Sequence, residues 1–319
     1  MLPHVVCTLC ERNSFFKGAI VLLNSLIEAG FEGDFVIGHR KVSASSLRAF
    51  ESDFAEFKVS HPRSEMVNVQ LVRVDTSRHL TNFKPFFLRQ ILQQSDDIPS
   101  GLWYIDPDIV VKAAWTDLLD WIQYGIAVCE DLNSPIYPRH PRRMQWHKVA
   151  RRNEITEWRE LRVYANAGFI GLKEDNYAFL DRWRRFITIM ENIYDDVPGS
   201  ENSALKVVDS RDGSNEPFFH MDQDCLNAAL TCSSWDISFI GKEGMDFAYG
   251  GQWMSHATGS CKPWNKPFIK SALQGKGLRQ VDRLYWDCAD KPLQAHTPSE
   301  IRNAKRRIKV AAFVERFIA

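Results

Sequence analysis

The stretch Leu102–Val111, with the sequence Leu-Trp-Tyr-Ile-Asp-Pro-Asp-Ile-Val-Val, has the most apolar strand pattern in the chain. Asp106 and Asp108 interrupt it, although burying an unpaired carboxylate is costly. Side chains two residues apart on an extended segment point the same way, and Pro107 favours extended geometry at Asp106. Two carboxylates roughly 6 Å apart repel by about 3 kcal/mol at an effective dielectric near 20, whereas a divalent cation such as Mg²⁺ or Mn²⁺ attracts both. A turn with aspartates capping backbone amides is the simpler alternative.

The residues around this stretch alternate between strand and helix patterns. Such alternation predicts an α/β fold in which helices cover both faces of a parallel sheet. Ligands of such sheets bind at the carboxyl ends of the strands, which is where the two aspartates lie. We expect strands at 4–9, 34–38, 69–74, 102–111 and 125–129, and helices at 20–29, 43–54 and 83–93.

Composition excludes several classes of protein. The 319 residues carry 40 Lys plus Arg and 40 Asp plus Glu, so the chain lacks the basic excess of a nucleic-acid coat protein, and we expect no nucleic-acid partner. Aromatic residues make up 12%, which argues against disorder. The seven scattered cysteines, the absence of a signal-peptide pattern and the absence of a long apolar run predict a cytoplasmic protein.

Three later segments combine glycine with polar residues. They read Tyr-Ala-Asn-Ala-Gly-Phe-Ile at 164–170, Asp-Gln-Asp-Cys-Leu-Asn at 222–227 and His-Ala-Thr-Gly-Ser-Cys-Lys-Pro-Trp at 256–264. Together with Asp106-Pro107-Asp108, and in this order, they resemble the motifs of glycosyltransferase family 8, the glycogenin and galactosyltransferase-like group of GT-A glycosyltransferases. The resemblance covers residues 4 to about 267.

The resemblance implies a fold, a domain organisation and an activity. The fold would be the GT-A (nucleotide-diphospho-sugar transferase) fold, with a Rossmann-like, mostly parallel central sheet flanked by helices. Residues 1–290 would form the catalytic domain, with a variable acceptor-side segment at about 133–163, and 291–319 a basic helix. The activity would be metal-dependent transfer of a hexose from a nucleotide-diphospho-sugar, expected to be a UDP-sugar, to a glycan or glycolipid hydroxyl, with retention.

By the same resemblance, Asp106, Asp108 and His256 hold the metal, Mn²⁺ or Mg²⁺. An imidazole nitrogen is an acceptable Mn²⁺ ligand beside two carboxylates. Gly259 would let the backbone approach the diphosphate closely, and the Lys262 ammonium would bind it and stabilise the leaving group. Taken alone, His256 favours a packed core histidine over a metal ligand, and a solvated surface lysine is the alternative for Lys262.

The remaining implied site residues would surround the sugar and the nucleoside. Asn166 can donate to and accept from sugar hydroxyls, although a β-bulge also explains Asn166 and Gly168. Asp222 and Gln223 would be catalytic, near the sugar hydroxyls and the anomeric carbon, although a helix N-cap also explains Asp222. An exposed lysine remains the alternative for Lys84. The full donor-binding set comprises Thr8, Lys84, Asp106, Asn166, Ala167, Gly168, Gly259 and Lys262.

Two basic regions bear on partners. Residues 139–162 hold eight Arg or Lys against three Glu, which suits a phosphorylated or otherwise anionic glycan acceptor, or else a solvated helix at 148–160. The carboxyl-terminal helix places basic residues on one stripe, which suits either peripheral contact with the cytoplasmic face of an anionic membrane or docking on the domain. That stripe comprises Arg302, Lys305, Arg306, Lys309 and Arg316.

Two other classes of protein stay open. A haloacid-dehalogenase-like phosphatase also carries an Asp-x-Asp motif after a hydrophobic strand, with Asp106 as its nucleophile, although that motif usually opens its domain. The other alternative is a non-catalytic relative that binds nucleotide-sugars.

Overall fold

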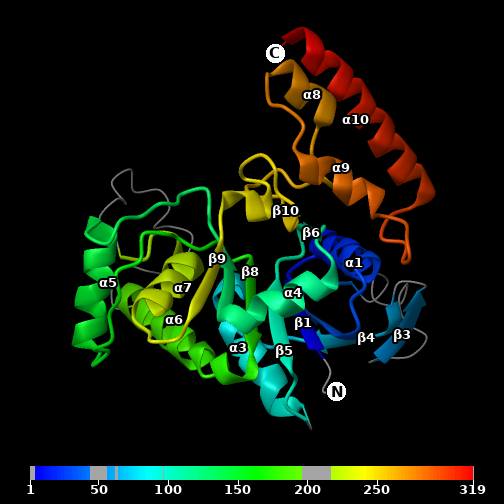
Figure 1. Ribbon diagram of the computed structural model, residues 1–319. Helices are drawn as coiled ribbons and strands as arrows, with labels where there is room; N and C mark the ends of the chain where they lie inside the picture. Colours follow the sequence, from blue (N-terminus) through cyan, green and yellow to red (C-terminus); the bar gives the residue numbers. More distant parts are fainter. Residues whose placement is uncertain (1–3, 44–55, 62–63, 96, 196–216, 319) are drawn as a thin grey trace. The chain divides into compact units, whose positions relative to one another are not determined.

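The computed structural model describes residues 4–43, 56–61, 64–95, 97–195 and 217–318 (Figure 1). The chain divides into two compact units. The first unit comprises Pro3–Val74, Ile105–Leu119 and Glu243–Ala319, and the second comprises Asp75–Tyr104 and Asp120–Lys242. Each unit combines β-strands with helices, so the expected α/β class is confirmed.

The sheet of the first unit has the strand order β3-β4-β2-β1. β1 runs parallel to β2, and β2 runs parallel to β4, while β3 is an antiparallel edge strand. The strands are β1 (His4–Cys10), β2 (Gly33–His39), β3 (Glu56–His61) and β4 (Ser64–Arg73). The predicted strands at 4–9, 34–38 and 69–74 are therefore confirmed, whereas the hairpin of β3 with β4 was not predicted from the sequence.

Helix α1 (Asn13–Glu28) packs against this sheet through a run of buried residues from Ala19 to Ile27. It begins seven residues before the predicted start at 20, because the residues preceding the apolar run also adopt helical geometry. Its buried Asn24 donates to the carbonyl oxygens of Cys288 and Leu293, both at 2.7 Å. These bonds attach the carboxyl-terminal segment to α1. The predicted helix at 43–54 lies almost entirely outside the described residues.

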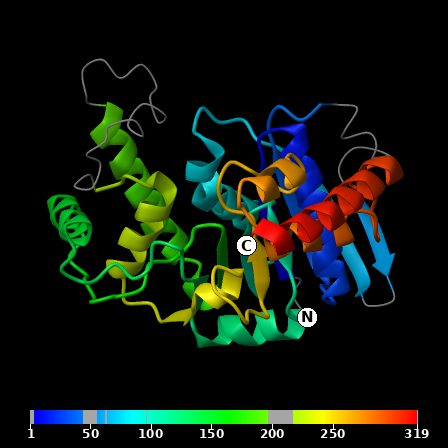
Figure 2. The same ribbon diagram turned by 90° about the horizontal axis from the view of Figure 1, so that it is seen from above.

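The carboxyl-terminal helices are α8 (Phe268–Leu273), α9 (Gln280–Asp287) and α10 (Pro298–Ile318). α10 packs against α8 and α9, as Figure 2 shows. Its buried face consists of Ile301, Ala304, Ile308 and Ala311. This apolar stripe is therefore covered by the protein. Within the described residues, no helix is both long enough and apolar enough to cross a membrane.

The second unit has the strand order β5-β8-β7-β9. β7 runs parallel to β9 and antiparallel to β8. The strands are β5 (Gly101–Ile105), β7 (Ile126–Cys129), β8 (Phe169–Lys173) and β9 (Ile237–Ile240). β5 and β7 confirm the strands predicted from 102 and at 125–129. The predicted strand 102–111 is wrong in one respect: it breaks at the two aspartates, and β6 (Ile109–Val111) follows separately.

The main helices of the second unit are α3 (Leu80–Gln94), α5 (Pro141–Arg152), α6 (Phe179–Asp195) and α7 (Met221–Thr231). α7 packs against α6 and α5, which Figure 1 shows as neighbours. α3 confirms the helix predicted at 83–93. The alternative helix at 148–160 is corrected to Pro141–Arg152, because the chain leaves helical geometry at Asn153. Short helices also occur at Trp115–Trp121 (α4), Ile122–Tyr124 (η1), Glu174–Asn176 (η2) and Lys242–Met245 (η5).

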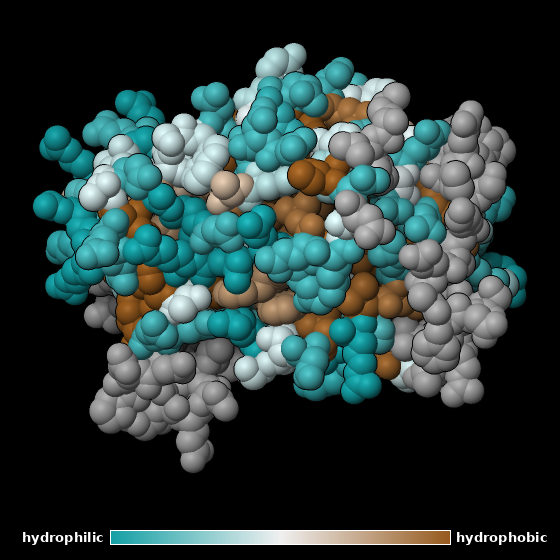
Figure 3. Space-filling view, turned by 90° about the horizontal axis from the view of Figure 1, so that it is seen from below, coloured by the Kyte–Doolittle hydropathy of each residue, from teal (hydrophilic) through white to brown (hydrophobic). Residues whose placement is uncertain are grey.

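The surface drawn in Figure 3 is mostly hydrophilic on the face it shows, with hydrophobic residues in smaller patches between polar ones. The cysteines Cys7, Cys10, Cys129, Cys225 and Cys232 are buried, and no disulfide joins cysteines in the described part of the chain. Burial raises the pKa of Cys232 to about 12, so its thiol stays protonated at neutral pH. These five cysteines therefore serve as small core residues.

Candidate active site

Backbone pairing in the first unit brings the two aspartates beside a histidine. The Ile109 N–H donates to the Asp106 carbonyl at 3.0 Å and closes the turn between β5 and β6. β6 pairs antiparallel with β10 (Met254–His256), so that Ile109 lies opposite His256. The Ala257 N–H then donates to the Asp108 carbonyl at 3.0 Å. A short two-stranded ladder thus joins segments that are almost 150 residues apart in sequence.

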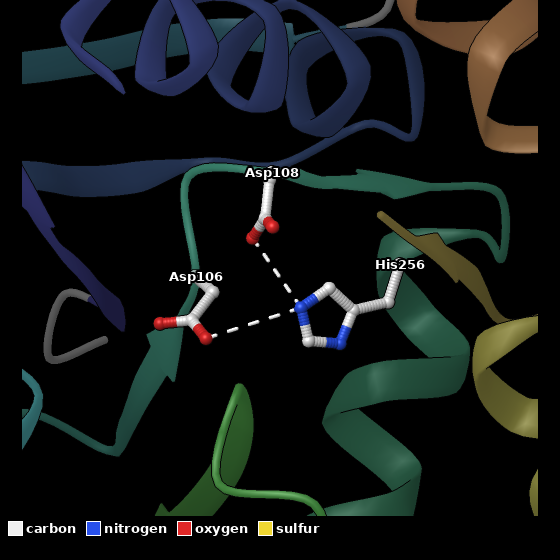
Figure 4. A group of neighbouring side chains, drawn as sticks. All are labelled: Asp106, Asp108 and His256. Carbon is white, nitrogen blue, oxygen red and sulfur yellow. Dashed lines mark ion pairs between the residues drawn. The ribbon is translucent and has the colours of Figure 1, made fainter. Parts of the chain in front are cut away.

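The side chains of Asp106, Asp108 and His256 converge, as Figure 4 shows. His256 Nε2 lies 3.3 Å from Asp108 Oδ1 and 4.0 Å from Asp106 Oδ2. One ligand atom from each residue lies within 4.8 Å of the others. Two carboxylate oxygens and an imidazole nitrogen form the type of donor set that Mn²⁺ accepts, so these residues fit a divalent metal. We call these three residues the acidic cluster.

The burial of the three side chains differs. Asp108 is 4% exposed and His256 is 9% exposed, whereas the Asp106 side chain keeps 22% of its surface. The cluster is therefore open on the Asp106 side. His256 Nδ1 is buried and makes no hydrogen bond within the described part of the chain. Metal-ligating histidines commonly donate this second N–H to a neighbouring group, whereas here the imidazole packs beside Phe247 and contacts Asp106 and Asp108 through Nε2.

Lys262 completes the charge balance of the acidic cluster. Its ammonium contacts Asp108 Oδ2 and donates to the Ala257 carbonyl at 2.7 Å. Burial would raise the pKa of Asp108, but the charges and hydrogen bonds of His256 and Lys262 outweigh it and hold that pKa well below the usual range. The alternative of a solvated lysine is wrong, because the Lys262 side chain is only 16% exposed.

Two glycines near the cluster have different roles. Gly259 has φ +79, and a Cβ there would meet nothing within 4 Å, so the left-handed backbone alone requires glycine. Gly18 lies on α1, and a Cβ there would lie 2.3 Å from the Pro107 carbonyl oxygen. Only glycine lets α1 approach the Asp106-Pro107-Asp108 turn so closely. Sequence reasoning missed Gly18, since a glycine within a helical pattern carries no information about its distant neighbour.

Thr8 lies on β1 and is completely buried. Its hydroxyl finds no hydrogen-bond partner among the residues that the structure describes. Trp264 packs between Phe15 and Tyr285, with ring centroids at 5.3 and 5.4 Å. This residue is therefore part of an aromatic core, which agrees with a packing role.

A second cluster, in the second unit, surrounds Lys84. The Lys84 ammonium donates to the Ala167 carbonyl at 2.9 Å and lies 3.2 Å from Asp222 Oδ2. It also lies 5.0 Å from the centroid of the Tyr104 ring. Lys84 is 3% exposed, so the alternative of an exposed lysine is wrong. A buried cation with a carboxylate and a carbonyl partner orients the groups that it binds.

The segment before β8 is held by side-chain hydrogen bonds. Asn166 Nδ2 donates to Asp131 Oδ2 at 2.6 Å, and Asn166 Oδ1 accepts from the Gly168 N–H at 2.8 Å. The Ala167 N–H donates to Gln223 Oε1 at 3.2 Å. Sequence reasoning missed Asp131, whose only signal is its position directly after a predicted strand. We call Lys84, Asp131, Asn166, Asp222 and Gln223 the amide cluster.

Helix α7 presents Asp222 and Gln223 from its first turn, after the N-cap residue His220. Asp222 is therefore not the N-cap, and that alternative is wrong. Asp224, the next acidic residue, is buried and accepts from Tyr164 Oη at 2.7 Å and from the His220 N–H at 2.6 Å. Burial raises the pKa of Asp224, although Arg142, 3.6 Å away, opposes the shift.

Asn227, further along α7, binds the backbone of Ala165 twice: its Oδ1 accepts at 2.7 Å and its Nδ2 donates at 2.8 Å. These two bonds keep α7 in register with the segment that carries Asn166.

The basic acceptor-side segment is partly structural. Arg143 is completely buried and donates to the Ile136 carbonyl and to Thr231 Oγ1, both at 2.7 Å, and to the Val163 carbonyl. Burial lowers its pKa to about 10, so it remains charged at neutral pH. Arg143 therefore connects this segment to α7 and is not available to an acceptor.

Comparisons with known proteins bear on the fold. No protein-family model matches the chain, and no curated protein matches it in sequence. Its fold is similar to that of LgtC: an active-site mutant of LgtC superposes with a TM-score of 0.52 at 15% identity, covering 94% of this chain and 99% of that one. The galactosyltransferase LgtC in complex with donor and acceptor sugar analogs superposes with a TM-score of 0.50 at 14% identity.

Two larger proteins are similar as well. The WbbM bifunctional glycosyltransferase has a TM-score of 0.52 at 15% identity, and the glycosyltransferase GlyE of Streptococcus pneumoniae TIGR4 has 0.52 at 12%. The chain spans about half of WbbM (52%) and 64% of GlyE. Together these similarities define the fold: a mixed α/β fold of the GT-A class, with a mostly parallel central sheet flanked by helices, as the sequence predicts.

Proposed function

We propose that the protein is a metal-dependent glycosyltransferase of the family 8 type. It transfers a hexose from a nucleotide-diphospho-sugar, a UDP-sugar in our proposal, to a hydroxyl of a glycan, glycolipid or phosphorylated acceptor, with retention. The observation that carries the proposal is the acidic cluster with Lys262 on a fold similar to that of glycosyltransferases. Residues 1–290 are assigned to the catalytic domain, 133–163 to the acceptor side and 291–319 to a basic helix.

In this proposal, Asp106, Asp108 and His256 would hold Mn²⁺ or Mg²⁺, which would supply positive charge for the departing diphosphate. Lys262 adds an ammonium that the Ala257 carbonyl keeps in place. A preorganised cation near developing negative charge lowers the barrier to the loss of the leaving group. Gly259 keeps its backbone open to a phosphate, and Thr8 is assigned to the nucleoside side of the donor site.

The amide cluster is assigned to the sugar. Asp222, held by Lys84, accepts from sugar hydroxyls, and Gln223 is oriented by the Ala167 N–H beneath the anomeric carbon. Asn166 uses one N–H and one lone pair within the protein, so its second N–H remains for the sugar, beside Ala167 and Gly168. The bond from the anomeric carbon to the diphosphate breaks, the acceptor oxygen bonds on the same face, and its proton goes to the diphosphate.

Donor turnover tests this proposal directly. The purified protein should hydrolyse UDP-glucose or UDP-galactose in the presence of Mn²⁺, and the preferred donor should raise the Tm only when Mn²⁺ is present. Asp108→Asn should abolish this turnover. Asp246→Asn is the matched control, because Asp246 is also a poorly exposed acid paired with a lysine, Lys112 at 2.5 Å.

The same assays separate the alternatives. Turnover of nitrophenyl phosphate that requires Asp106, without donor binding, would identify a phosphatase instead. Donor binding without turnover or transfer would identify a non-catalytic relative.

Peripheral contact with the cytoplasmic membrane face is a second part of the proposal. Phe313 and Phe317 on α10 are 60% and 74% exposed, with ring centroids 5.0 Å apart. Arg316 and Lys309 are also exposed on α10. Exposed aromatic rings beside basic residues suit an anionic lipid surface. The protein should co-sediment with phosphatidylglycerol vesicles but not with phosphatidylcholine vesicles. The double variant Phe313→Ser, Phe317→Ser should co-sediment less with phosphatidylglycerol vesicles than the wild type. Equal sedimentation of the variant and the wild type would contradict this assignment.

A further inference from the structure

We propose that a surface pocket in the second unit is an auxiliary saccharide-binding site, which holds one neutral hexose unit of a glycan. The pocket has a volume of about 360 Å³ and is lined by Gln123, Tyr124, Lys173, Asp175, Asn176 and Asp236, with Gly125 among them. We call it the Tyr124 pocket. That the glycan is an acceptor of this protein rests on the proposed function.

The Tyr124 pocket and the amide cluster lie at opposite ends of the strands of the second unit. Tyr124 directly precedes β7 and Asp236 directly precedes β9, while Lys173 ends the antiparallel β8. Asp131 follows β7, and Asn166 precedes β8. Because a strand rises about 3.3 Å per residue, these four- and five-residue strands separate the two regions by roughly 13–17 Å. The pocket is therefore a second binding site and not an extension of the first.

The composition of the lining suits a sugar. Tyr124 is 73% exposed, so its ring offers a flat apolar face together with a hydroxyl. Asp175 and Asp236 are acceptors for sugar hydroxyls, and the Asn176 and Gln123 amides can both donate and accept. A pocket that combines one aromatic face with convergent polar groups can both stack on a pyranose ring and fix its orientation.

Asn176 points to a ligand independently of this composition. The residue is 6% exposed, and its Nδ2 is buried without a hydrogen-bond partner in the described structure. Leaving a buried donor unsatisfied costs about 1–3 kcal/mol, so native proteins rarely retain one without a reason. Asn176 also lines the pocket, so a hydroxyl or ring oxygen of a sugar that reaches its amide would accept this hydrogen bond. A bare cation would not, because the unsatisfied group is a donor.

The charges of the lining select a neutral ligand. Lys173 is paired with Asp175 at 3.3 Å, which leaves the Asp236 carboxylate as the second acid of the lining. Two carboxylates against one ammonium disfavour uronic acids and sugar phosphates. Gly125 brings Tyr124 and Asp236 together: it has φ +125, and a Cβ there would lie 2.5 Å from the Asp236 carbonyl oxygen. Only glycine permits this approach.

The experiment is ligand-observed saturation-transfer NMR with lactose, maltose and cellobiose, and with glucuronate as the charged probe. It uses the full chain without nucleotide-sugar or Mn²⁺. At least one disaccharide should bind, and glucuronate should not. Tyr124→Ala should weaken this binding about tenfold or more, since it removes the ring face on which the sugar would stack. Tyr249→Ala is the matched control, because Tyr249 is also an exposed tyrosine but lies outside both the pocket and the acceptor-side segment 133–163.

A second variant separates binding from structure. Asn176→Ala should also weaken disaccharide binding but should not lower the Tm, because the buried Nδ2 donor that it removes has no hydrogen-bond partner within the described residues. Any of three results would overturn the proposal. They are failure of every disaccharide to bind, equal binding to the wild type and to Tyr124→Ala, and displacement of the sugar by Ca²⁺. Without donor or Mn²⁺ in the sample, the result is independent of the proposed transferase activity. Conversely, Tyr124→Ala should leave Mn²⁺-dependent donor hydrolysis unchanged.

Discussion

The Lys262 ammonium contacts one carboxylate oxygen of Asp108, while the other oxygen of Asp108 faces the His256 imidazole. The same buried carboxylate is therefore shared between a fixed internal cation and a candidate metal ligand. Any cation that enters the acidic cluster must compete with Lys262 for Asp108. This relationship makes the effect of removing Lys262 diagnostic.

We predict that Lys262→Ala changes metal binding and turnover in opposite directions. Removing the ammonium takes away the cation that pairs with Asp108, so Mn²⁺ measured by calorimetry without donor should bind several-fold more tightly. Donor turnover should fall by about 10²–10³, because a preorganised positive charge is lost at the leaving group. Weaker Mn²⁺ binding in the variant would contradict the competition between Lys262 and the metal.

Gly18→Ala should destabilise the protein despite the better helix propensity of alanine. The new Cβ would lie 2.3 Å from the Pro107 carbonyl oxygen, so either α1 or the Asp106-Pro107-Asp108 turn must move. We expect a loss of about 1–3 kcal/mol in the free energy of unfolding, measured by urea denaturation, together with weaker Mn²⁺ binding. Gly277→Ala is the control, since the nearest atom to its Cβ would be 4.0 Å away. Equal stability of the two variants would show that the turn is not constrained by α1.

Lys84→Met should lower the free energy of unfolding, because it leaves two groups without their partner. The Asp222 carboxylate and the Ala167 carbonyl would both lose their buried cationic partner, and we expect a loss of about 2–4 kcal/mol. Lys173→Met removes an exposed pair with Asp175 and should change the free energy of unfolding by less than about 1 kcal/mol. If both variants unfold at the same urea concentration, Lys84 does not stabilise the amide cluster.

His296 should make the protein less stable in mild acid. Burial lowers the pKa of His296 to about 4, where Lys17 also opposes its charge and Glu300 partly favours it. An unfolded histidine titrates near 6.5, so between about pH 6.5 and 4 the unfolded state binds more protons, and stability falls as the pH falls. The loss contributed by one such group is on the order of 1–3 kcal/mol across that window.

The control for this titration is His296→Gln, which can still bond to Tyr285, the 2.8 Å partner of His296 Nε2. Its free energy of unfolding, measured between pH 7 and pH 4, should vary less with pH than that of the wild type. Parallel pH profiles would assign the acid sensitivity to other groups.

Local patterns in the sequence were sufficient for the class of fold. The alternation of apolar periodicities predicts β1, β2, β4, β5 and β7, because strand and helix periods depend only on which positions of a segment face the core. The spacing of Asp106 and Asp108 likewise predicts two convergent carboxylates. The motif that contains His256 is local too, and its resemblance to a family 8 segment is what associates the imidazole with the two aspartates.

Only the tertiary structure decided how charges are paired. For Lys84 and Lys262 the sequence leaves a surface lysine open as the alternative, yet one is buried against Asp222 and the other against Asp108. Asp131, Gly18 and the Tyr124 pocket each depend on contacts between segments distant in the chain. A residue's periodicity reports the face on which it lies, whereas its charge partner is set by which segments the fold brings opposite it, and no local pattern carries that information.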